Sequence, residues 1–251
     1  MRVIYRPRGR AGEYAEWAAN LYTGCAHRCI YCYGADVTHT DKEKFETEPL
    51  PRHKVLERLQ ADARDLQREE RSIDVLLCFV TDPYQPLEDV MGVTRQAIQI
   101  LHRYGHTVTI LTKGGKRAMR DIADGTLGPG DTFASTLTLL NDQDSQHWEP
   151  GAALPLDRIE SLKIAKEHGL ATWVSLEPVI KPNDSLDIIR ATHKFVDLFK
   201  VGKMNYHPQG LTINWHKFAN DVVRLCRELK HPYFLKIDLE KYLRGGRGIT
   251  R

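Results

Sequence analysis

Short apolar runs alternate with amphipathic segments along most of the chain. The nearly continuous apolar run at 73–80 is typical of a strand that is buried on both faces of a parallel sheet. Similar strands are predicted at 18–22, 106–111, 131–137, 171–176, 195–201 and 233–237. Amphipathic helices are predicted at 53–70, 93–104, 116–124, 155–168, 184–192 and 214–229. Six or seven strands, each paired with a helix, predict a parallel α/β sheet that closes as a complete or partial barrel.

Polar side chains follow several of these predicted strands. Barrel active sites are assembled from the loops at the carboxyl ends of the strands, so we expect these side chains to meet at one mouth. They are Thr81, Asp82, Thr112, Lys113, Ser135, Thr136, Glu177 and Lys203.

Composition and length are those of an ordinary globular protein. The chain has 251 residues, of which 41% are hydrophobic and 27% charged, and we expect one domain over 1–251 with a barrel at 18–237. A basic tail at 241–251 could contact nucleic-acid phosphates or remain solvated. Since no apolar run could span a bilayer and no secretion signal begins the chain, we expect a cytoplasmic protein without a membrane. The net charge of +3 permits an anionic partner without requiring one.

Three of the five cysteines lie in one short loop. Cys25, Cys29 and Cys32 have the spacing C-x3-C-x2-C, which is typical of metal or iron–sulfur ligands. An iron–sulfur cube ordinarily takes four cysteines, so three would leave one iron open to a small molecule, and an open position favours catalysis. The alternative is a zinc site with His27 or His39 as fourth ligand, in a nucleic-acid-binding module without catalysis.

With Tyr31 before its third cysteine, this loop resembles the cluster loop of radical S-adenosylmethionine (radical SAM) enzymes. The resemblance implies a 4Fe-4S cluster on the three cysteines and S-adenosylmethionine on the fourth iron. Reductive cleavage of that cofactor would give a 5′-deoxyadenosyl radical that takes a hydrogen atom from a substrate. The resemblance also implies a partial (β/α)6 TIM-like barrel with the cluster loop after its first strand, and an electron donor such as flavodoxin or ferredoxin.

A second motif narrows the resemblance. The string T-D-P-Y-Q-P-x-E at 81–88 resembles a motif of the spore photoproduct lyase-like branch, also described as DNA repair photolyase-like. Nucleic acid is therefore one candidate substrate, beside a peptide or a small metabolite, and the reaction type stays open between lyase, oxidoreductase and transferase. The lyase of this branch returns a hydrogen atom from a cysteine. Here Phe79 takes that position, and the neighbouring Cys78 is expected to face away from the cofactor, which disfavours thymine-dimer repair.

The resemblance further assigns cofactor contacts. Tyr31 and Tyr33 would flank the adenine, and Lys113 would pair with the cofactor's carboxylate. Thr81 and Asp82 would hold an amine or ribose hydroxyls, Ser135 would offer a hydroxyl, and Glu177 would meet the ribose or the substrate. Each assignment has a structural alternative: core packing for the tyrosines, helix capping for threonine and aspartate, a backbone hydrogen bond for serine, and a salt bridge for glutamate.

Overall fold

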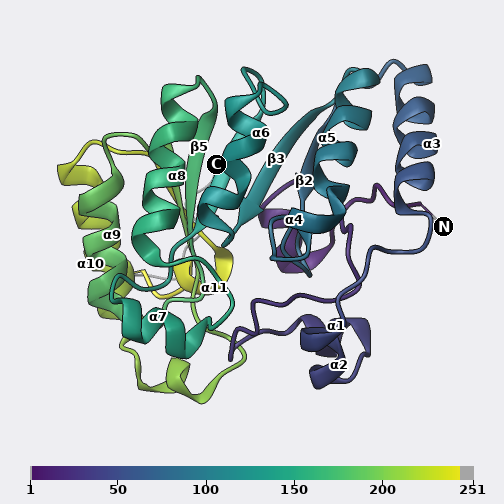
Figure 1. Ribbon diagram of the computed structural model, residues 1–251. Coiled ribbons are helices and arrows are strands. Elements are labelled where there is room, and N and C mark those ends of the chain that lie inside the picture. The colour runs from purple at the N-terminus through teal and green to yellow at the C-terminus, as the bar shows by residue number, and fades with distance from the viewer. Residues whose placement is uncertain (1, 244–251) are drawn as a thin grey trace.

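The computed structural model describes residues 2–243, and its centre is one sheet of seven parallel strands (Figure 1). The order of the strands in the sheet follows their order in the chain, and every neighbouring pair is parallel. They are β1 (Trp17–Ala19), β2 (Asp74–Leu77), β3 (Thr107–Thr112), β4 (Thr132–Thr136), β5 (Ala171–Leu176), β6 (Leu198–Val201) and β7 (Tyr233–Leu235). The sheet curls into a half-barrel, which confirms the predicted partial TIM-like barrel.

Long helices cover the outer face of the sheet, where α5, α6 and α8 lie in front of the strands in Figure 1. The long helices are α3 (Val55–Arg68), α5 (Val93–Arg103), α8 (Pro155–Glu167), α9 (Pro182–Thr192) and α10 (Trp215–Glu228), and the shorter α6 is Met119–Ala123. The helix predicted at 116–124 is instead a 3-10 turn, η2 (Gly115–Ala118), that continues into α6.

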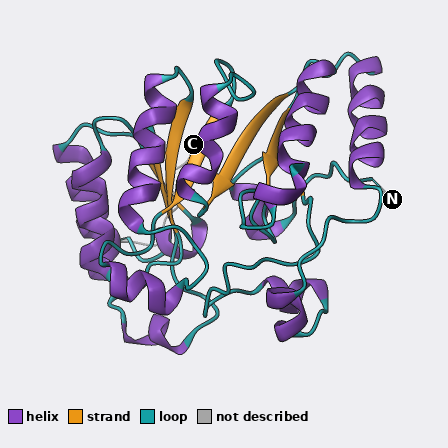
Figure 2. Cartoon of the chain, in the orientation of Figure 1, coloured by secondary structure: helices purple, strands orange, loops and turns teal. Residues whose placement is uncertain are grey.

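Short helices that the pattern did not predict lie mostly near the edge toward which the strand arrows point (Figure 2). They are η1 (Gly9–Glu13), α1 (Gly34–Thr38), α2 (Lys42–Thr47), α4 (Glu88–Met91), α7 (Asp142–Trp148), η3 (Pro208–Thr212) and α11 (Ile237–Glu240). Within the described residues, no helix is both long and apolar enough to cross a membrane. From residue 244 on, the predicted basic tail lies outside the described residues.

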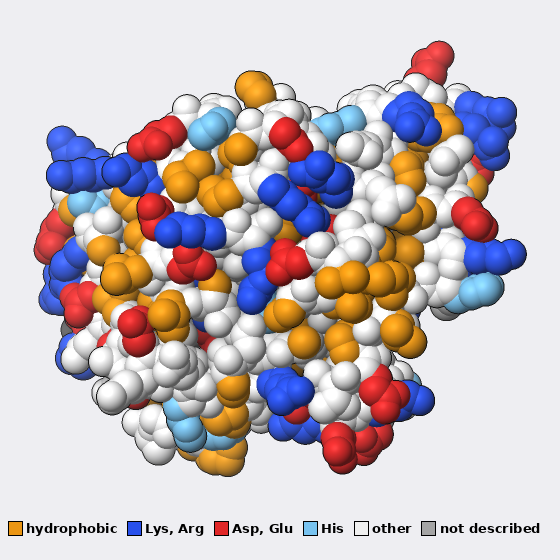
Figure 3. Space-filling model, viewed as in Figure 1, with side chains coloured by type: hydrophobic (Ala, Val, Ile, Leu, Met, Phe, Trp, Pro, Cys, Tyr) orange, Lys and Arg blue, Asp and Glu red, His pale blue; other side chains and the backbone are white. Residues whose placement is uncertain are grey.

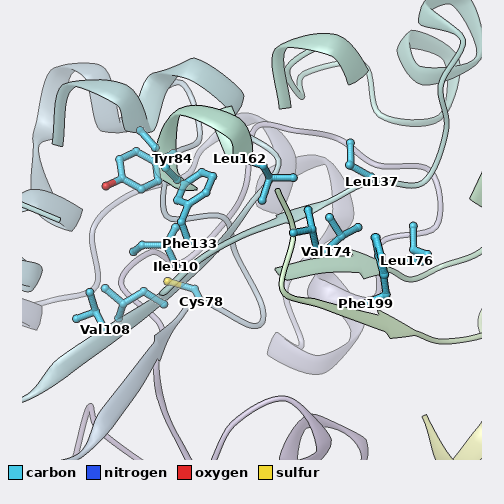
Figure 4. Close-up of a cluster of buried hydrophobic side chains, with 14 of the residues drawn as sticks. Cys78, Tyr84, Val108, Ile110, Phe133, Leu137, Leu162, Val174, Leu176 and Phe199 are labelled. Carbon is cyan, nitrogen blue, oxygen red and sulfur yellow. The ribbon is translucent and has the colours of Figure 1, made fainter. Parts of the chain in front are cut away.

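Alternate strand residues enter two separate cores. Val75 and Leu77 of β2 pack in a large cluster beneath the helices, part of which is drawn in Figure 4. Leu76, between them, packs in a smaller cluster inside the half-barrel together with Ala134 and Trp173. The continuous apolar runs in the sequence therefore reflect burial on both faces of the sheet.

The N-terminal segment links the two edge strands of the half-barrel. Tyr5 pairs with Ala18 of β1 through two backbone hydrogen bonds of 3.0 and 2.9 Å. Eight residues later, the Glu13 carboxylate accepts a 2.7 Å hydrogen bond from the backbone N–H of Ile237, just beyond β7. This segment therefore spans the open side of the barrel.

Candidate active site

One cavity of about 660 Å³ lies among the carboxyl ends of the strands, within the size range of small-molecule sites. All three cysteines of the C-x3-C-x2-C loop line it. Six of the seven residues predicted to contact the cofactor line it too, namely Tyr31, Tyr33, Thr81, Asp82, Lys113 and Glu177. Segments far apart in the sequence therefore converge on one mouth.

Ser135 is the exception, because the structure does not bring its side chain to the cavity. Its hydroxyl is buried and donates to the carbonyl oxygen of Thr112 at 3.2 Å. The next residue, Thr136, lines the cavity instead. Successive strand residues point to opposite faces, and Ala134 already faces the interior of the half-barrel, so Thr136 shares that face and Ser135 does not.

The cysteine loop is held from two sides. From α2, the carbonyl oxygen of Phe45 accepts a 2.9 Å hydrogen bond from the backbone N–H of Cys25, and the Phe45 ring packs beside the loop. From the proline-rich turn, the buried amide of Gln85 accepts from the Ala26 N–H and donates to the Gly24 carbonyl, both at 3.0 Å. The T-D-P-Y-Q-P motif is thus partly a scaffold for the cysteine loop.

The three cysteines of the loop do not converge on one position where a single ion could contact all of them. Burial raises the pKa of the Cys29 thiol to about 12 and that of Cys25 well above its ordinary value, so unliganded thiols stay protonated near neutral pH. Within residues 2–243, no three His, Cys, Asp or Glu side chains converge closely enough to hold one ion. Zinc needs thiolates about 2.3 Å from a single metal, whereas a cluster distributes them over different irons.

The Asp82 carboxylate lines the cavity and is hydrogen-bonded extensively within the protein. Its carboxylate accepts from the Thr112 hydroxyl (2.6 Å) and from the backbone N–H groups of Lys113 (2.7 Å) and Tyr84 (2.8 Å), and it lies 3.4 Å from His27 Nδ1. Burial by itself would raise the pKa of Asp82, but His27 and these donors hold it well below its usual range. Asp82 therefore stays ionised and joins the loop after β2 to the end of β3.

Three other polar groups of the cavity keep free hydrogen-bonding capacity. Thr81 Oγ1 and His27 Nε2 are buried and have no hydrogen-bond partner among the residues described. Lys113 Nζ lies 5.7 Å from the centroid of the Tyr31 ring. Burial would lower the pKa of Lys113, but electrostatic interaction with Cys29 and Glu149 raises it above its ordinary value, so the ammonium persists. These groups are therefore available to bind a ligand in the cavity.

Glu177 belongs to a network that sequence reasoning missed. Its carboxylate accepts from the Tyr14 hydroxyl and from Lys236 Nζ at 2.7 Å, and all three residues line the cavity. The Tyr14 hydroxyl also lies 3.0 Å from Ser175 Oγ. Tyr14 comes from the N-terminal segment and Lys236 from beyond β7, so no local sequence pattern connects them to Glu177. The salt-bridge alternative for Glu177 is therefore present in the structure.

Two further buried charges lie behind Tyr31. The hydroxyl of Tyr31 donates to the Glu149 carboxylate, which forms a 2.6 Å ion pair with Arg158 of α8. The Glu149 and Arg158 side chains are 0% and 1% exposed, and neither residue lines the cavity. The sequence offered one signal for this buried pair. Glu149 is an acidic residue inside the turn W-E-P-G, ahead of a helix that begins with proline.

Comparison with known proteins identifies the class. The family model described as the Radical SAM superfamily matches residues 19–196, and the chain belongs to that superfamily. It is thus an enzyme of the radical SAM class, which overturns the alternative of a zinc-stabilised module without catalysis.

Individual relatives share less than a third of their aligned residues with this chain. The chain is 28% identical over 240 residues to the uncharacterized proteins Rv2578c of Mycobacterium tuberculosis and Mb2609c of Mycobacterium bovis, covering 91% of this chain and 68% of each relative. A spore photoproduct lyase complexed with dinucleoside spore photoproduct superposes with a TM-score of 0.69 at 13% identity, over 92% of this chain and 79% of that one. SuiB of Streptococcus suis bound to S-adenosylmethionine gives 0.60 at 11% identity, over 87% and 49%.

Proposed function

We propose that this enzyme holds a 4Fe-4S cluster on Cys25, Cys29 and Cys32 and binds S-adenosylmethionine at the fourth iron. When bound and reduced, such a cluster supplies the electron that cleaves the cofactor to methionine and a 5′-deoxyadenosyl radical, which abstracts a hydrogen atom from the substrate. The observation that carries the proposal is that the three cysteines share one cavity with the unpaired hydroxyl of Thr81 and the ammonium of Lys113.

The protein's own residues then bind and orient the cofactor. Lys113 Nζ pairs with its carboxylate, and the Thr81 hydroxyl bonds its amine or a ribose hydroxyl. Tyr31 and Tyr33 flank the adenine as cavity walls. Asp82 acts indirectly, because it fixes the backbone of Lys113.

The experiment is anaerobic purification, followed by iron and sulfide analysis and turnover with dithionite and S-adenosylmethionine. We expect about four irons per chain and release of 5′-deoxyadenosine. Cys29→Ala should lose both, whereas Cys226→Ala should keep both, since Cys226 is buried in α10 and does not line the cavity. Zinc in place of iron, with no product, would contradict the proposal. Flavodoxin or ferredoxin should replace dithionite as the electron donor.

For the substrate, we favour a nucleic-acid strand over a peptide or small metabolite. The cavity is also lined by Arg8, Arg10, Tyr33 and Tyr206. Tyr206 is 67% exposed, its ring centroid lies 5.7 Å from that of Tyr33, and the Arg10 guanidinium lies 5.8 Å from it. Exposed aromatic rings beside arginines can stack bases and contact phosphates.

This substrate assignment is tested by titrating a fluorescent single-stranded DNA oligonucleotide at two salt concentrations. On the face seen in Figure 3, Lys and Arg side chains are interspersed with Asp and Glu. The test therefore compares an arginine that lines the cavity with one that does not. Arg8→Ala should weaken binding and reduce its salt dependence, whereas Arg103→Ala, at the end of α5 and outside the cavity, should not. Equal effects of the two variants would exclude the oligonucleotide from the cavity.

A further inference from the structure

The segment that joins α7 to α8 contacts the cysteine loop without lining the cavity. At Trp148, its carbonyl oxygen accepts a 2.9 Å hydrogen bond from the backbone N–H of Ile30. At Gly151, its backbone N–H donates to the carbonyl oxygen of His27, also at 2.9 Å. Both loop residues lie within two positions of Cys29, so the 148–153 segment fixes the backbone around a cluster ligand.

The same segment reaches the ends of two strands. The backbone N–H of Ala153 donates to the carbonyl oxygen of Lys113 at 2.9 Å. Arg158 donates from Nε to the Ala153 carbonyl (2.7 Å) and from Nη1 to the carbonyl of Thr136 (3.1 Å). Lys113 follows β3, Thr136 ends β4, and both line the cavity. The 148–153 segment and Arg158 therefore join the cysteine loop to the cofactor side of the cavity.

Two features indicate that substitutions in the 148–153 segment would disturb the cysteine loop. A Cβ atom at Gly151 would overlap the carbonyl oxygen of Ala26, so only glycine fits without moving the cysteine loop. The Glu149 carboxylate binds both the Tyr31 hydroxyl and the Arg158 guanidinium. Because the Glu149 carboxylate and the Arg158 guanidinium are both buried, removing either one leaves the other without a counter-charge.

We propose that the 148–153 segment, with Arg158, is a positioning element that couples the cluster loop to the cofactor-binding ends of β3 and β4. This inference rests on the proposed function. The residues of the element act through the cysteines, Lys113 and Thr136 rather than on the cluster or cofactor. A change in the element should therefore alter iron retention and S-adenosylmethionine affinity together, while a change at Lys113 or Thr81 should alter the affinity alone.

The test uses Gly151→Ala and Glu149→Gln in the full chain. We expect faster hydrogen exchange of the amides at 25–32 in the iron-free protein. In the reconstituted protein we expect iron loss to a chelator to accelerate about 10-fold and S-adenosylmethionine affinity to fall about 10- to 100-fold. Gly128→Ala is the matched control, because its Cβ would meet only the Gly125 carbonyl oxygen, at 3.9 Å, and all three quantities should be unchanged.

A second control separates positioning from general stability. Leu225→Ala truncates a buried side chain of α10 that does not line the cavity, and it should lower the melting temperature without changing iron loss or affinity. If both element variants behave like Leu225→Ala, the element is merely structural and the inference is wrong. Loss of iron retention with unchanged affinity would overturn the coupling. A wild-type chain that takes up no iron would instead refute the proposed function, and exchange in the iron-free protein would still test the positioning.

Discussion

The Asp82 carboxylate accepts a 2.7 Å hydrogen bond from the backbone N–H of Lys113. The same carboxylate accepts from the Thr112 hydroxyl at 2.6 Å, so it fixes both residues at the end of β3. The Lys113 side chain then extends into the cavity from a backbone that cannot shift independently. Asp82 therefore fixes the backbone from which the Lys113 ammonium extends.

Asp82→Asn tests this role. The amide keeps the size of the side chain but loses the negative charge that several donors and His27 face. We expect the free energy of unfolding to fall by about 1–3 kcal/mol at neutral pH, as for loss of a buried charged acceptor. Urea denaturation measures this change. Unchanged stability would show that Asp82 is free for ligand binding.

Thr81 and Thr112 form a matched pair for separating binding from folding. Thr81 Oγ1 has no partner among the described residues, whereas the Thr112 hydroxyl donates to Asp82. Thr81→Val should leave the free energy of unfolding within about 0.5 kcal/mol of wild type and weaken S-adenosylmethionine binding. Thr112→Val should lower the free energy of unfolding by about 1–3 kcal/mol. Calorimetric titration measures the affinity of each variant, and urea denaturation measures its free energy of unfolding. Equal affinities of Thr81→Val and wild type would remove Thr81 from the site.

Lys113→Met retains the aliphatic stem and removes the charge. We expect the variant to keep its iron and to bind S-adenosylmethionine about 10-fold more weakly, because a charge-assisted hydrogen bond is lost. Lys203→Met is the control, since Lys203 Nζ lies over the rings of Trp215 and Tyr242 and does not line the cavity. Equal affinities of the two variants would exclude Lys113 from cofactor binding.

Lys200 predicts a pH dependence of stability. Its Nζ lies inside the half-barrel, 4.3 Å from the centroid of the Trp173 ring, and donates to the Tyr14 carbonyl at 2.8 Å. Burial lowers the pKa of Lys200 from 10.5 to about 8. Between these values the unfolded chain binds more protons than the folded one, so the free energy of unfolding should rise with pH from about 8 to 10.5.

The measurement is urea denaturation of wild type and Lys200→Met across that interval. The lowered pKa of Lys200 corresponds to a rise in the free energy of unfolding of at most about 3 kcal/mol, and solvent that reaches the side chain reduces this rise. Below pH 8 the lysine is charged in both states, and the stability difference between the two proteins should be constant. Parallel curves across the whole interval would mean that Lys200 titrates normally.

Local patterns in the sequence determined much of this enzyme. Continuous apolar runs predict strands buried on both faces, and the sheet contains strands in all the places expected. The spacing of Cys25, Cys29 and Cys32 predicts one ligand loop, because nearby residues on one loop must share a location. Polar residues directly after strands predict a shared mouth, because parallel strands end at the same edge.

Ser135 shows where a local pattern stops. A one-residue error in judging which face a strand residue occupies moves its side chain to the other side of the sheet, and here the cavity position belongs to Thr136. Short helices such as α1 and α7 were also missed, since contacts with the cysteine loop rather than periodicity stabilise them.

Tertiary structure decided the contacts between distant residues. Tyr14 meets Glu177 and Lys236 because the N-terminal segment crosses the open side of the barrel, and Glu149 meets Tyr31 because the 148–153 segment passes behind the cysteine loop. The hydrogen bonds of Asp82 also depend on tertiary structure, because the fold brings the Thr112 hydroxyl and the Lys113 N–H to its carboxylate. Sequence spacing specifies which groups are close along the chain, whereas burial and pairing depend on chain segments that only folding brings together.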